Sequence, residues 1–151
     1  MNNKILVSLI ALSMILIMGI YFLINPSYQK SIQAKYYFEM GDYKQALVLA
    51  KESFAMDVYN RMSSTIMAQS VTALKYVEYV ENGKTYMKQI NEIATHESIS
   101  DADKAKIKII CEIMVDSYVK LAPSVITDKE LVAQAANYHA NFEKLLAKVT
   151  R

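Results

Sequence analysis

The sequence predicts an all-α protein in which an N-terminal transmembrane helix is followed by three helical hairpins. An uncharged apolar run stands near the N-terminus, and elsewhere apolar residues recur at helical spacing without the alternation typical of strands. The hydrophobic share of 53% is too high for a disordered chain, and 151 residues suit one domain of the usual size of about 100–200 residues. We therefore expect a transmembrane signal anchor over residues 1–25 and one helical domain over residues 26–151.

The composition excludes several classes of protein. A net charge of +2, from 17 basic and 15 acidic residues, creates no field strong enough to hold nucleic acid. The single cysteine, Cys111, excludes a disulfide framework and a cysteine-rich metal site. Three separated glycines cannot form a phosphate-binding loop. With no catalytic motif in the sequence, we expect neither an enzyme nor a bound cofactor or metal.

The predicted membrane segment runs from Ile5 to Ile24 without a charged residue. A helix of this length spans about 30 Å, which matches the hydrocarbon thickness of a bilayer. Asn25-Pro26 ends the helix, because the residue before a proline resists the α conformation. Aromatic rings near the exit end favour the membrane interface. We expect contact with the bilayer through residues 5–24, including Ile5, Leu12, Ile17, Tyr21 and Phe22.

An uncleaved anchor is favoured over a signal peptide, because the apolar run exceeds the ~7–15 residues of a signal-peptide core and no A-x-A-like cleavage site follows. The orientation has two interpretations. Counting Lys30, Lys35 and Lys44 against Lys4 favours a cytoplasmic domain, whereas a short lysine-bearing N-terminus is typical of bacterial anchors that export the rest. We expect a single-pass protein of the bacterial inner membrane with a periplasmic helical domain, and the cytoplasmic orientation stays open.

The rest of the chain is predicted to form six helices in three antiparallel pairs. Gly41-Asp42 and Asn82-Gly83 are read as breaks between paired helices, and Pro123 ends the fifth helix. Two capping boxes, Ser100 with Asp103 and Thr127 with Glu130, open the last two helices. The expected helices cover residues 27–40, 43–56, 59–80, 84–95, 101–121 and 127–148.

Residues 27–60 resemble a tetratricopeptide repeat (TPR). Ala34 and Tyr37 match the small residue and the tyrosine of the family's first helix, and Gly41 matches its turn. Tyr43 and Ala46 match the start of its second helix, and the small alanines let two helices approach closely. The sequence departs from the family at three further positions, which hold Lys30, Ser53 and Val58.

The second and third hairpins carry a weaker pattern. Glu81-Asn82-Gly83 echoes Glu39-Met40-Gly41, and residues 101–149 have the character of a helical hairpin without a repeat signature. The resemblance therefore implies a short TPR-like α-solenoid of one clear repeat and two divergent hairpins. The last helix either caps this stack or lies in its groove.

Tyrosines are the most informative candidates for binding. They are concentrated in the first two predicted hairpins, and a tyrosine suits both a helical core and a protein interface, because its ring packs while its hydroxyl finds a polar partner. Both interpretations stay open. The tyrosines that we expect to line a partner-binding groove are Tyr36, Tyr37, Tyr43, Tyr76 and Tyr79.

Histidine and cysteine give weaker signals. His139 and Glu143 are four apart on a predicted helix, which suits an ion pair better than a metal site, because two ligands do not make a site. Cys111 lies among apolar residues, which predicts a buried and unreactive thiol.

The resemblance implies a function in protein binding, because TPR-like folds take a peptide or a helix of a partner on their concave face. We expect a membrane-anchored scaffold or adaptor that binds a membrane or envelope protein within an envelope-spanning machine, such as a flagellar motor, a pilus or a secretion assembly. The alternative is a membrane-tethered chaperone or assembly factor for a membrane-protein client.

Overall fold

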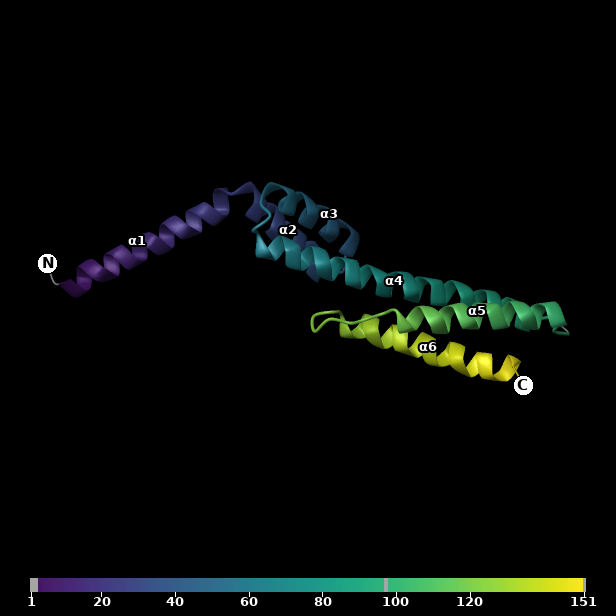
Figure 1. The fold of residues 1–151 in the computed structure, drawn as a ribbon. Helices are drawn as coiled ribbons and strands as arrows, with labels where there is room; N and C mark the ends of the chain where they lie inside the picture. The colour runs from purple at the N-terminus through teal and green to yellow at the C-terminus, as the bar shows by residue number, and fades with distance from the viewer. Residues whose placement is uncertain (1–2, 97, 151) are drawn as a thin grey trace. The chain divides into compact units, whose positions relative to one another are not determined.

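The computed structural model of the chain describes residues 3–96 and 98–150. No strand occurs among these residues, so the all-α prediction is confirmed. The chain divides into two compact units, unit 1 at Met1–Ser70 and unit 2 at Val71–Arg151, and each is described by itself. The helices of the described residues are α1 Asn3–Ile24, α2 Pro26–Glu39, α3 Tyr43–Met56, α4 Arg61–Ala94, α5 Asp101–Val119 and α6 Lys129–Val149 (Figure 1).

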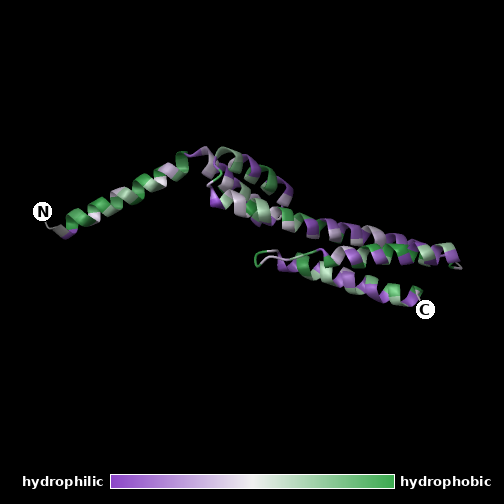
Figure 2. Cartoon of the chain, viewed as in Figure 1, coloured by the Kyte–Doolittle hydropathy of each residue, from purple (hydrophilic) through white to green (hydrophobic). Residues whose placement is uncertain are grey.

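Among the described helices, α1 is the one that is long and apolar enough to cross a membrane, over Lys4–Ile24. Figure 2 shows hydrophobic residues along almost all of α1, whereas the other helices alternate hydrophobic and hydrophilic residues. None of the span is buried, and a signal sequence has these same properties. The hydroxyls of its two serines donate hydrogen bonds to backbone carbonyls of the preceding turn. Ser8 Oγ donates to Lys4 O at 2.9 Å, and Ser13 Oγ donates to Ile10 O at 2.8 Å.

The predicted break at Asn25-Pro26 is confirmed, since α1 ends at Ile24 and α2 begins at Pro26. Asn25 has an extended backbone, and its side chain accepts a hydrogen bond from Ser27 N at 2.9 Å. Proline at the first helical position costs nothing, because that N–H has no partner within a helix. The sequence therefore stops one helix and starts the next within two residues.

Unit 1 is built around a hairpin of α2 and α3, whose buried cluster combines three alanines with Leu49 and with Ile66 of α4. Ala34 of α2 and Ala46 and Ala50 of α3 are each fully buried, which lets the helix backbones approach closely, as predicted. Gly41 makes the turn with φ +81, a conformation that side chains with a Cβ rarely adopt. Asp42 then caps α3 by accepting a hydrogen bond from Gln45 N at 3.0 Å.

The end of this hairpin nearest α1 holds a buried polar cluster, which we call the serine–asparagine cluster. Ser27 Oγ donates to Ser53 O at 3.0 Å, and the hydroxyls of Ser53 and Ser63 share a hydrogen bond at 2.5 Å. Asn60 Nδ2 donates to Ser27 Oγ at 2.9 Å. Asn60 Oδ1 accepts from the backbone of α4 at Met62 N, 3.1 Å away. The cluster comprises Ser27, Ser31, Ser53, Asn60 and Ser63, all at most 2% exposed.

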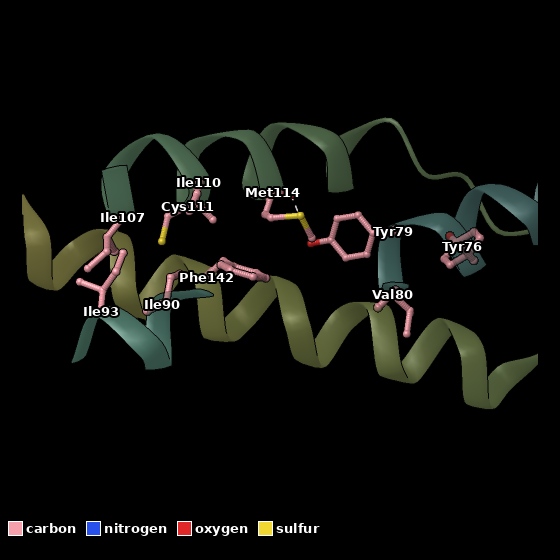
Figure 3. Close-up of a cluster of buried hydrophobic side chains, with 11 residues drawn as sticks. Tyr76, Tyr79, Val80, Ile90, Ile93, Ile107, Ile110, Cys111, Met114 and Phe142 are labelled. Carbon is pink, nitrogen blue, oxygen red and sulfur yellow. Dashed lines mark hydrogen bonds between the residues drawn. The ribbon is translucent and has the colours of Figure 1, made fainter. Parts of the chain in front are cut away.

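Unit 2 is built from residues 71–94 of α4 together with α5 and α6. Its core consists of larger side chains than the buried cluster of unit 1, and Figure 3 shows them pointing toward one another from the three helices. The core residues are Tyr76, Tyr79, Val80, Ile90, Ile93, Ile107, Ile110, Cys111, Met114, Ala135 and Phe142.

The predicted break at Asn82-Gly83 is wrong. The helices expected at 59–80 and 84–95 are one helix, α4, so the second hairpin does not exist and neither does the arrangement of three hairpins. Gly83 serves a different purpose: a Cβ built there would lie 2.8 Å from Cγ of Tyr138 on α6. The glycine therefore admits a tyrosine ring against the backbone of α4 rather than making a turn.

Of the two predicted capping boxes, the first is confirmed and the second is wrong. Asp103 N donates to Ser100 Oγ at 3.1 Å, while Ser100 N donates to Asp103 Oδ2 at 3.2 Å. At α6 the cap is Asp128, whose side chain accepts from Glu130 N at 2.8 Å. Thr127 Oγ1 instead accepts from Ser124 N at 2.8 Å. Asp128 rather than Thr127 caps the helix, because Asp128 directly precedes Lys129, the first residue of α6.

Candidate functional site

Unit 2 carries an open groove of about 340 Å³ between α4 and α5, which we call the α4–α5 groove. Its floor holds apolar and aromatic side chains and its rim holds charged ones, the composition expected of a surface that takes a helix or peptide. The groove is lined by Lys75, Glu78, Tyr79, Asn82, Tyr86, Ile113, Met114, Ser117, Lys120 and Leu121.

The α4 wall depends on the continuity of that helix. Tyr79, Asn82 and Tyr86 are three and four residues apart, so they share one face of α4. Tyr79 is 4% exposed and forms part of the floor, whereas Tyr86 is half-buried. A break at Asn82-Gly83 would have placed the two tyrosines on different helices.

The α5 wall is joined to α4 by a hydrogen bond from Tyr79. The Tyr79 hydroxyl donates to Met114 O at 3.2 Å, and Figure 3 shows it pointing from α4 toward α5. Burial raises the pKa of Tyr79 to about 12, and Tyr118 and Glu143 add to the effect. At neutral pH the hydroxyl is protonated, as a tyrosine of ordinary pKa would also be, and it joins α4 to α5 as a donor. Ile113, at 47% exposed, offers apolar surface to a partner.

The charges at the rim come from both helices. Lys75 and Glu78 stand on α4, and Lys120 directly follows α5. Two cations and one carboxylate around an apolar floor suit an amphipathic helix that carries acidic residues beside its apolar face.

A larger hollow of about 490 Å³ lies between α4 and α6 of unit 2. Met87 and Tyr138 are the large apolar side chains of its lining, against five in the α4–α5 groove. The α4–α5 groove is therefore the stronger candidate. The hollow is lined by Lys84, Met87, Lys88, Asn91, Glu92, Thr95 and Tyr138.

The structure does not gather the five predicted tyrosines. Tyr36, Tyr37 and Tyr43 belong to unit 1, where Tyr36 is 57% exposed, Tyr37 is half-buried and Tyr43 is buried. Tyr76 and Tyr79 belong to the core of unit 2, and burial raises the pKa of Tyr76 as well. Of the five, Tyr79 lines the α4–α5 groove.

The sequence reasoning missed Tyr86, Ile113 and Leu121 as groove residues. The spacing of Tyr79, Asn82 and Tyr86 could have found the α4 wall, had Asn82-Gly83 not been taken for a turn. Nothing local in the sequence pairs this stripe with Ile113 and Leu121, because the pairing depends on how α5 packs.

The predicted anchor residues all lie on α1 and are exposed. Ile5, Leu12, Ile17 and Tyr21 are between 54% and 66% exposed. Phe22 is 38% exposed, and its ring lies edge-on to Tyr28 of α2 with centroids 4.6 Å apart.

The structure also shows the surroundings of His139 and Cys111. His139 Nδ1 lies 3.6 Å from Glu143 Oε2, as the predicted ion pair requires, and its ring stacks on Tyr118 with centroids 4.1 Å apart. Cys111 is fully buried, as predicted, and burial raises the pKa of its thiol. Among the described residues, no group of three or more His, Cys, Asp or Glu side chains could hold a metal ion.

Comparisons of the chain with protein-family models, with curated proteins and with solved structures gave no match. The resemblance of residues 27–60 to a TPR therefore rests on those residues themselves.

Proposed function

We propose that the chain is a membrane-anchored scaffold or adaptor whose α4–α5 groove binds a helix of another protein. The observation that supports it is an open apolar groove with a charged rim, in a chain whose α1 is apolar and long enough to span a membrane. The anchor would attach the chain to the membrane, and the partner would itself be a membrane or envelope protein.

Recognition would follow the chemistry of the groove. Apolar side chains of the partner helix would pack on Tyr86, Ile113 and Leu121, and acidic residues beside them would meet Lys75 and Lys120. Because the groove is a surface of two packed helices, a third helix laid along it would bury apolar area on both walls.

The setting in this proposal is the bacterial inner membrane, with the helical units in the periplasm and the partner in an envelope-spanning machine such as a flagellar motor, pilus or secretion assembly. The TPR-like residues of the α2–α3 hairpin support a role in scaffolding, since helical repeats generally bind proteins. This step is an analogy at the level of fold.

The test is co-purification from native membranes in mild detergent, with mass spectrometry of the recovered proteins. Full-length protein is compared with Ile113→Gln, which changes the groove, and with Val119→Gln. Val119 is 79% exposed, lies on the same helix and does not line the groove, so it is the matched control. Removing apolar contact worth about 1.5 kcal/mol lowers affinity roughly tenfold.

We expect a stoichiometric membrane partner with the unchanged protein and with Val119→Gln, and about tenfold less of it with Ile113→Gln. Equal recovery of the partner with both variants would show that the α4–α5 groove is not the binding site. Recovery of the unchanged protein alone would favour the alternative, a tethered chaperone or assembly factor that meets its client transiently.

A further inference from the structure

The connection between α3 and α4, in unit 1, carries a group of exposed apolar side chains. Tyr59 is 87% exposed, Val58 is 59% and Met56 is 54%. Met62, in the first turn of α4, adds a further 36%-exposed side chain. Single exposed apolar residues are ordinary, but four within residues 56–62 mark a surface that meets something apolar. We call Met56, Val58, Tyr59 and Met62 the α3–α4 tip.

The serine–asparagine cluster holds this tip beside the start of α2. Asn60, the neighbour of Tyr59, donates from Nδ2 to Ser27 Oγ at 2.9 Å and to Ser31 Oγ at 3.3 Å. Ser27 comes three residues after Ile24, the last residue of α1, and the extended Asn25 lies between them, so the chain separates the two by at most about 10–11 Å. Figure 1 shows the connection between α3 and α4 near the start of α2.

This upper limit is comparable to the depth of the lipid headgroup layer. The hydrocarbon core of a bilayer is about 30 Å thick and the whole bilayer about 40–45 Å, which leaves about 5–8 Å of headgroup region on each side. If α1 spans the core and ends at its boundary, Ser27 and the tip bonded to it lie in that region or at its outer edge.

Aromatic residues at the same end of α1 fit this depth. Phe22 and Tyr28 pack edge-on with centroids 4.6 Å apart, and Tyr21 lies 6.4 Å from Tyr28. Tyrosine is enriched at membrane interfaces, where its ring meets the acyl boundary and its hydroxyl meets water. Tyr59 would add a further aromatic side chain to the membrane contact.

The polar residues of the connection are compatible with a lipid surface. Asp57 accepts a hydrogen bond from Tyr59 N at 2.9 Å, so its carboxylate is engaged by the backbone of the turn. Arg61, which directly follows the connection, is exposed and can meet a lipid phosphate.

We propose that the α3–α4 tip is a second membrane contact, which places Val58 and Tyr59 at the boundary of headgroups and acyl chains. This inference rests on the proposed anchoring of α1 in the membrane. Its consequence is that unit 1 meets the bilayer at two points, so that the direction in which α2 and α3 leave the membrane is fixed.

The test uses the absence of tryptophan from the sequence, which makes any introduced tryptophan a sole reporter. Three variants of the full chain are placed in vesicles of phosphatidylethanolamine and phosphatidylglycerol: Tyr59→Trp at the tip, Leu12→Trp in the middle of α1, and Tyr36→Trp. Tyr36 is 57% exposed and lies toward the Gly41 end of α2, so it is the matched control away from the tip. Fluorescence is recorded with and without brominated lipids.

We expect Leu12→Trp and Tyr59→Trp to emit at shorter wavelength than Tyr36→Trp and to be quenched by brominated lipid, whereas Tyr36→Trp is not quenched. If Leu12→Trp is quenched and Tyr59→Trp is not, the anchor stands and the tip contact is wrong. If neither is quenched, the anchoring itself fails. Equal quenching of Tyr36→Trp would also overturn the inference, because the hairpin would then lie along the surface.

Discussion

The interiors of the two units of this chain are built from different kinds of side chain. The core of unit 1 combines three alanines with Leu49 and Ile66, and beside it lies the serine–asparagine cluster, in which Asn60 contacts hydroxyls from α2 and α3. The core of unit 2 consists of aromatic and branched side chains around Phe142. Unit 1 therefore depends on buried hydrogen bonds as well as on a small apolar core, whereas unit 2 depends mainly on the area of apolar surface that it buries.

This difference has a functional reading. A buried polar cluster is satisfied only in one arrangement of its helices, so it suits the segment that joins α1 to the rest of the chain. An apolar core tolerates volume-conserving substitutions, so the helices that form the α4–α5 groove can vary in sequence and still pack.

The largest effect is expected in the apolar core of unit 2. Phe142→Ala removes a fully buried ring and leaves a cavity, which costs about 3–5 kcal/mol of folding free energy. Urea unfolding of the full chain in detergent, followed by helical circular dichroism, measures the loss. Lys144→Ala, an exposed change on the same helix, is the control and should cost less than about 0.5 kcal/mol. Similar small losses in both variants would show that Phe142 is not a core residue.

The corresponding change in unit 1 is Asn60→Ala. It removes the cap of α4 and leaves the hydroxyls of Ser27 and Ser31 without this donor, so we expect a loss of about 2–4 kcal/mol by the same measurement. Ser31→Ala removes one of the accepting hydroxyls and keeps the cap, so it measures the contribution of that hydrogen bond separately. A loss below about 0.5 kcal/mol for Asn60→Ala would contradict the role of the cluster.

Tyr79 gives unit 2 a dependence on alkaline pH. Its folded pKa of about 12 lies above its ordinary value of 10.0, so the folded state disfavours the ionised phenol. The stabilisation is present below pH 10 and is lost as the pH rises toward 12, by about 2–3 kcal/mol in total. Tyr79→Phe cannot ionise, so the stability difference between the two proteins should shrink over this range. A constant difference from pH 9 to pH 12 would show that Tyr79 is not held in its neutral form.

Gly83→Ala tests whether this glycine is a site of close approach or a turn. Alanine in a helix is ordinarily favoured over glycine by about 1 kcal/mol. Here its Cβ would lie 2.8 Å from Tyr138 Cγ, and such overpacking costs about 1–3 kcal/mol, so we expect a net loss near 1 kcal/mol. In a Tyr138→Ala background the same change should become stabilising, as measured by a double-mutant cycle. A loss that is independent of Tyr138 would restore the interpretation as a turn.

The smallest effect is expected at Ser70. Within the described part of the chain, its buried hydroxyl has no hydrogen-bond partner. Ser70→Ala removes an unsatisfied group and raises helix propensity, so we expect a gain of about 0.5–1 kcal/mol. Ser53→Ala, in which a bonded serine is lost, is the matched control and should be destabilising. A loss at Ser70 as large as that at Ser53 would mean that the Ser70 hydroxyl is satisfied after all.

Local signals in the sequence were enough for much of the fold. The length of α1, the stop at Asn25-Pro26, the turn at Gly41 and the cap at Ser100 each depend on neighbouring residues, and all were predicted. Gly83 was misread because an Asn-Gly pair favours a turn locally, whereas in the structure it lies inside α4 with the ring of Tyr138 from α6 against it. The predicted count of hairpins failed with it.

The candidate site was less predictable for the same reason. Tyr79 was named from the sequence, but its neighbours in the groove come from α5, about 35 residues further along the chain. The serine–asparagine cluster was not predicted, because a buried serine and an exposed serine cannot be distinguished by residue type. Only packing brings Ser27 and Ser53 into contact with Asn60.

The central claim, that α1 remains as a membrane anchor on the helical units, is tested most directly by the intact mass of the protein recovered from cells that express the full chain. We predict the uncleaved mass, with α1 included, in the membrane fraction and its release only by detergent. A chain shortened at or near residue 25 and recovered in the soluble fraction would show that α1 is a signal sequence, and it would contradict both the proposed anchoring and the second membrane contact.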